Sequence, residues 1–124
     1  MIIQDLVSIK DIQQEFHKMY PGLKMVFYRS KHHDHQGSDK AEEYTSDHIL
    51  RDIRQRHTEG SIEIKPQMTV KELEYDFEEL YGLHIQIFRK SGAVWLQTIA
   101  TDDWTLAKQN EKGLSLDKEE IVAG

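Results

Sequence analysis

Two segments of the chain repeat one order of features: a helix pattern, a glycine and an alternating strand pattern. They are residues 8–30 and 69–91. In both, a hydroxyl residue precedes apolar residues spaced three and four apart, which is the spacing of one face of an α-helix. The apolar positions coincide when the segments are aligned: Ile9, Ile12, Phe16, Met19 and Tyr20 correspond to Val70, Leu73, Phe77, Leu80 and Tyr81. We therefore predict two similar helix–strand units that share one core.

The duplication extends beyond these two segments. A short strand pattern precedes each helix, at residues 1–4 and 62–65. We predict pseudo-repeats over about 1–57 and 61–113, within a single α+β domain that covers residues 1–124.

Two further segments have helix patterns. Residues 46–57 carry an apolar face and a basic last turn, and residues 104–110 follow aspartates that can cap a helix. We predict a helix in each segment, with Gly113 ending the second.

The strand patterns favour an α+β fold over a parallel α/β fold. Residues 83–89 alternate apolar and polar side chains, whereas strands that are covered on both faces are continuously apolar. We predict a two-layer sandwich with helices packed on one face of the sheet and the other face partly exposed. Ferredoxin-like topology is the first choice, and a ubiquitin-like β-grasp fold for the second half is the alternative.

Composition argues against several classes of protein. The 124 residues include no cysteine, which excludes disulfides, thiolate nucleophiles and cysteine metal sites. The N-terminal segment lacks the basic start and apolar run of a signal peptide, and no segment has the roughly 18 apolar residues of a membrane span. We expect a soluble cytoplasmic protein with no membrane partner.

The net charge of −6 argues against nucleic acid as a partner, because binding to phosphates needs clustered cations. One short basic cluster, Arg51, Arg54 and Arg56, is flanked by the acids Asp52 and Glu59. We expect no nucleic-acid partner.

The stretch from Gly82 to Asn110 contains GLHIQIFRKSGAVWLQT and TDDWTLAKQN. It resembles a family of small bacterial proteins known only as uncharacterised. The resemblance covers the C-terminal third to half of the chain, and it implies neither an activity nor catalytic residues.

A histidine-rich segment contains His32, His33 and His35, with Asp34 among them. Imidazole and carboxylate groups bind zinc, nickel or copper when they converge on one centre. The spacing matches no established zinc motif, so we expect a polar insertion and no resident cofactor. A small metal-binding or metal-dependent enzyme using this segment is the alternative function.

Other signs of catalysis are missing from the sequence. It contains no glycine-rich phosphate loop, no G-x-S-x-G element and no paired carboxylates at catalytic spacing. We therefore expect a protein that is not an enzyme.

Three aromatic residues are candidates for an interaction surface. If Val94 and Leu96 face the core, strand alternation places Phe88 and Trp95 on the sheet face opposite the helices, and Tyr28 is a further candidate for this face. The alternative is that the C-terminal tail or the middle helix covers these aromatic residues. Aromatic side chains on an uncovered face usually contact a partner. We expect a small cytoplasmic interaction module, otherwise of unknown function, that binds a protein partner or a second copy of itself as a homodimer.

Overall fold

The structure, a computed structural model, describes residues 1–30 and 39–123, with side chains up to Ser115. The elements follow in the order β1 (Ile2–Ile3), α1 (Ile9–Met19), β2 (Leu23–Tyr28), β3 (Gly60–Ser61), α2 (Val70–Tyr81), β4 (His84–Ser91), β5 (Val94–Gln97) and α3 (Leu106–Ala123). Short 3-10 turns at Lys40–Glu42 and Leu50–Asp52 lie between β2 and β3. The predicted α+β class is confirmed.

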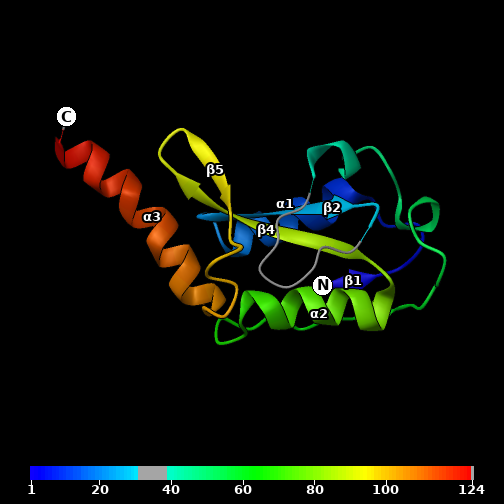
Figure 1. Cartoon of the computed structure of the whole chain (residues 1–124). Coiled ribbons are helices and arrows are strands. Elements are labelled where there is room, and N and C mark those ends of the chain that lie inside the picture. Colours follow the sequence, from blue (N-terminus) through cyan, green and yellow to red (C-terminus); the bar gives the residue numbers. More distant parts are fainter. Residues whose placement is uncertain (31–38, 124) are drawn as a thin grey trace.

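Within the described ranges the strands form two antiparallel sheets. The larger has the order β2-β4-β5, and the smaller pairs β1 with β3. Helix α1 packs on β2, and α2 packs on β4. Figure 1 shows α2 running along one side of the larger sheet, while α3 crosses near the β4–β5 hairpin and then extends away from the other elements.

The apolar faces predicted for α1 and α2 form the core. Phe16 and Phe77 are both fully buried, and the Phe77 ring meets the Phe27 ring edge-on, with 6.4 Å between centroids. Full burial of one such side chain contributes about 1.5–3 kcal/mol. The sheet supplies alternate residues of its inner face: Leu23, Met25, Phe27, Ile85 and Ile87.

The two units repeat the same main-chain hydrogen bonds. Ile9 N–H donates to the His48 carbonyl at 2.9 Å, and at the aligned positions Val70 N–H donates to the Trp104 carbonyl at 3.1 Å. A second matched pair joins Leu50 N–H to the Val7 carbonyl at 2.9 Å and Leu106 N–H to the Met68 carbonyl at 2.8 Å. The duplication predicted from the sequence is therefore present in the hydrogen bonding.

An approximate two-fold axis passes between Val26 on β2 and Gln86 on β4. These residues occupy aligned positions of the two units and pair with each other. On either side of them, the pair Lys24–Phe88 is matched by the pair His84–Tyr28. Equivalent strands thus meet across the axis, which is why β2 pairs with β4 and β1 with β3.

The strand order that results from this symmetry differs from the ferredoxin-like topology that was the first choice. Ferredoxin-like topology places both strands of each β-α-β unit in one sheet. Here the first strand of each unit has two residues and pairs outside the larger sheet. The β-grasp alternative departs for the same reason, since β3 does not join β4 and β5.

The helix predicted over 46–57 is wrong, because this part of the chain consists of turns and irregular segments. Only Leu50–Asp52 forms a 3-10 turn. Ile49 is paired as a bridge with Ser8, and the main chain on both sides bonds to the segment around the start of α1. These long-range bonds use groups that a helix would have bonded internally.

Helix α3 also differs from its predicted end, since it continues through Gly113 to Ala123. Gly113 lies against the main chain of Gly22, where a Cβ on Gly113 would come within 2.6 Å of the Gly22 carbonyl oxygen. Glycine at position 113 therefore allows α3 to approach the main chain just before β2, and it does not end the helix.

Candidate functional site: the outer face of the sheet

The outer face is the side of the larger sheet that is turned away from the core. Strand register places Lys24 opposite Phe88, and Lys90 opposite Trp95. Because side chains alternate along each strand, these four lie on one side. The structure therefore brings Phe88 and Trp95 to the face where the sequence placed them, and both are partly exposed.

Tyr28 belongs to the same face but is not accessible. Only 3 % of the residue is exposed, and its main chain is paired as a bridge with Glu43. Burial, together with the nearby Glu43 carboxylate, raises the pKa of Tyr28 to about 12. Tyr28 is therefore part of the protein interior, and its prediction as an exposed interaction residue is corrected.

Lys24 joins the two remaining aromatic residues. Its Nζ lies 5.2 Å from the ring centroid of Phe88 and 5.2 Å from that of Trp95. An ammonium group over an aromatic face is attracted by the negative face of the ring, typically by about 0.5–1 kcal/mol at exposed sites. The ammonium group of Lys24 therefore contacts one aromatic ring on β4 and one on β5.

Helix α1 forms a wall beside this cluster. Gln13 Nε2 donates to the Met25 carbonyl at 2.9 Å, and His17 Nδ1 lies 2.8 Å from the Leu23 carbonyl oxygen. A carbonyl oxygen only accepts, so Nδ1 of His17 carries the hydrogen and Nε2 is left for other contacts. The His17 ring also meets the edge of the Trp95 ring, with 6.0 Å between centroids.

Between this wall and the strands lies a groove of about 460 Å³, called here the first groove. Its polar and aromatic lining includes Lys10, Gln13, His17, Lys24, Glu43 and Trp95. The lining therefore combines cations, amides and one large aromatic side chain. Such a surface can hold a ligand by charge and by stacking.

A second groove of about 620 Å³ lies beside α2, and two of its lining residues occupy positions aligned with lining residues of the first groove. The aligned positions differ in charge: His17 corresponds to Glu78, and Lys24 corresponds to His84. His84 Nδ1 lies 4.0 Å from a Glu78 carboxylate oxygen. Among their described lining residues, the second groove has three acids and three arginines, whereas the first has two lysines and one carboxylate.

The basic cluster predicted from the sequence is largely structural. The Arg54 side chain is buried, and its guanidinium donates to the carbonyls of Thr58 at 2.8 Å and Tyr81 at 3.1 Å. Arg56 donates to the Glu78 carbonyl at 2.8 Å. Both arginines therefore satisfy carbonyls in the last turn of α2, where positive charge is favourable.

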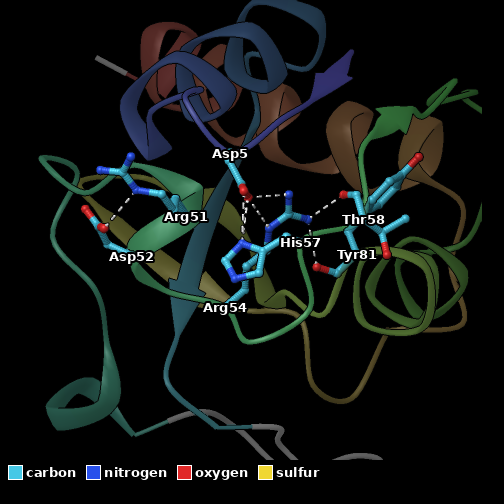
Figure 2. A network of polar contacts seen from close by, with 7 residues as sticks. All are labelled: Asp5, Arg51, Asp52, Arg54, His57, Thr58 and Tyr81. Atoms are coloured by element: carbon cyan, nitrogen blue, oxygen red, sulfur yellow. Dashed lines mark hydrogen bonds and ion pairs between the residues drawn. The ribbon is translucent and has the colours of Figure 1, made fainter.

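Asp5 completes this network (Figure 2). Its carboxylate lies 3.0 Å from Arg54 Nη2 and 3.0 Å from His57 Nδ1. The hydrogen bond with His57, supported by Arg54 and opposed by desolvation, holds the pKa of Asp5 below its usual value. Asp5 and Arg54 are far apart in sequence, and no motif pointed to their contact.

The metal hypothesis falls outside what the structure describes. His32, His33 and His35 lie in the segment between residues 30 and 39, which is not described. Among the described residues, no group of three or more histidines and acids is arranged to hold a metal ion.

Comparisons with protein-family models, curated proteins and solved structures find no match to this chain. In the described part of the chain, no helix has the length and apolarity needed to cross a membrane.

Proposed function

We propose that this protein is a non-catalytic interaction module that binds a protein partner through the outer face of its sheet. The observation that carries the proposal is the cluster of Lys24, Phe88 and Trp95, in which one ammonium group contacts two partly exposed rings at the rim of the first groove. Partly buried aromatic residues beside a groove are typical anchors of protein interfaces. A cytoplasmic location is part of the proposal, and the cysteine-free composition fits it.

The proposal is tested by site-specific photo-crosslinking. A benzophenone amino acid replaces Trp95 in one variant and Tyr75 in the other. Tyr75 is a matched control, because it is an aromatic residue that is 62 % exposed on α2. We expect the reagent at position 95 to capture one defined protein, and the reagent at position 75 to leave that protein uncaptured.

The captured protein is then purified and its affinity measured with Trp95→Ala and Tyr75→Ala. We expect Trp95→Ala to weaken binding by at least about tenfold, as loss of a central aromatic anchor does. Equal affinity of the two variants would contradict the proposal. Light scattering of the purified chain separates a different partner from a homodimer, whose mass would be twice 14.6 kDa.

A further inference from the structure

We propose that the first groove accepts an acidic segment of the partner in extended conformation. Its carboxylates would lie beside Lys10 and Lys24, and an apolar side chain would lie against Trp95. This inference rests on the proposed function and adds the chemistry of the occupant. It is carried by the charges of the groove, by the edge of β2 and by the position of Trp95.

The first groove carries more positive than negative charge among its described lining residues. Lys10 and Lys24 line the groove, and neither forms an ion pair within 4.0 Å with any described residue. Glu43 is the one carboxylate among the described lining residues. The chain as a whole has a net charge of −6, so this cationic surface contrasts with the rest of the molecule. Complementary charge steers a partner and fixes its register.

The edge of β2 supplies main-chain groups. Lys90 N–H donates to the Gly22 carbonyl at 2.9 Å, so the even-numbered residues of β2 bond to β4 and Met25 directs its N–H and carbonyl toward α1. The Met25 side chain is buried in the core (1 % exposed), and the residue therefore lines the groove with its main chain. Gln13 occupies the carbonyl, whereas the N–H is a donor suited to a peptide carbonyl or a carboxylate.

Trp95 indicates that the bound segment also carries an apolar side chain. An exposed lysine–carboxylate pair alone contributes little, about 0–1 kcal/mol. Apolar contact with the indole ring adds an anchor of the kind that dominates interfaces. In an extended segment, successive side chains point in opposite directions. Because Lys24 and Trp95 lie on one side of the sheet, the segment meets them with side chains two residues apart, one acidic and one apolar.

The test is calorimetric titration of the full chain at 0.15 M salt with a defined probe, acetyl-Glu-Glu-Val-Val-Glu-Glu amide, in which both faces of the extended segment carry acidic and apolar side chains. The control probe has glutamine at each glutamate position, which keeps length and shape and removes the charge. We expect the acidic probe to bind at least about tenfold more tightly than the neutral probe, the effect of two or three partly screened charge pairs.

Variants of the protein locate the binding site. Lys10→Glu/Lys24→Glu should weaken binding of the acidic probe by about a hundredfold, because two attractions become repulsions. Lys65→Glu/Lys112→Glu is the matched control, since it makes the same charge change at two exposed lysines outside the groove. Equal losses in the two double variants would show a non-specific charge effect and overturn the inference.

Failure of the inference is distinct from failure of the proposed function. The crosslinker at position 95 could capture a partner whose binding needs Trp95 while the acidic probe does not bind. That result would support the proposed interaction module and overturn the inference that an acidic segment occupies the groove. The acidic occupant is also overturned if light scattering shows a dimer that dissociates when two exposed acids on α2 are reversed in charge (Glu72→Lys/Glu79→Lys). In that case the groove accepts a second copy of this chain.

Discussion

Gly113 on α3 contacts the main chain of Gly22, the residue before β2: a Cβ on Gly113 would lie 2.6 Å from the Gly22 carbonyl oxygen and 3.1 Å from the Gly22 Cα. Gly22 N–H also donates to the Asn110 side-chain oxygen at 2.7 Å. The first part of α3 is thus held against the start of β2 by a close main-chain approach.

We expect Gly113→Ala to destabilise the protein, although alanine favours helices over glycine by about 1 kcal/mol. The added methyl group meets backbone atoms that cannot move independently, and overpacking of this kind costs about 1–3 kcal/mol. Urea unfolding followed by circular dichroism measures the change. Lys112→Ala, an exposed neighbour on the same helix, should change the free energy of unfolding by less than about 0.5 kcal/mol. A stabilised Gly113→Ala variant would contradict the close approach.

Matched N-caps give a second expectation. The hydroxyls of Ser8 and Thr69 accept from the N–H groups of Asp11 and Glu72, each at 3.0 Å. Ser8→Ala and Thr69→Ala should each lower the free energy of unfolding by about 1 kcal/mol. Ser8→Thr, which keeps the hydroxyl, should retain most of the stability. A cost confined to one of the two caps would show that the units are not energetically equivalent.

The parts of the fold that follow from local periodicity were predictable from sequence. Helices α1 and α2, their hydroxyl caps and the alternation of β4 depend on patterns within a few residues. Segment 46–57 was not predictable in this way. It has an apolar face, but its main-chain groups bond to the start of α1, and that contact is not encoded in its own pattern. The helix end predicted at Gly113 was wrong for a related reason. A glycine that ends a helix and a glycine that allows close main-chain contact cannot be distinguished from the sequence alone.

The candidate site was predictable only in part. Strand alternation placed Phe88 and Trp95 on the outer face, because it requires no knowledge of strand order. Tyr28 is buried, and its main chain pairs with Glu43, a long-range contact that alternation does not reveal. The role of Lys24 was missed, although its alternate position on β2 was a signal that it shares the face of Phe88.

The Asp5 network should make stability depend on pH. The pKa of Asp5 is lowered in the folded state, so its contribution is present above the usual value of 3.8 and is lost as the pH falls through the folded-state pKa. We expect Asp5→Asn to be less stable than the wild type at pH 6, and the difference to narrow at pH 3. Denaturant titrations at both pH values measure it. If the difference in free energy of unfolding between the two proteins does not change with pH, the ionisation of Asp5 does not contribute to stability.

The interface between the two pseudo-repeats should be strong enough to reassemble the chain from fragments. Both strand pairs that cross the approximate two-fold axis, β1–β3 and β2–β4, join one unit to the other. Fragments 1–59 and 60–124 would each expose half of the core, including Phe16 in one and Phe77 in the other. Strands β1, β2 and β3 would lose their sheet partners, and β4 would keep only β5. We expect each fragment alone to unfold without a cooperative transition, and the equimolar mixture to recover one. Phe77→Ala in the second fragment should prevent recovery, because loss of such a buried ring costs about 3–5 kcal/mol. A fragment that unfolds cooperatively by itself would show that one unit closes its own core, contrary to the shared core seen here.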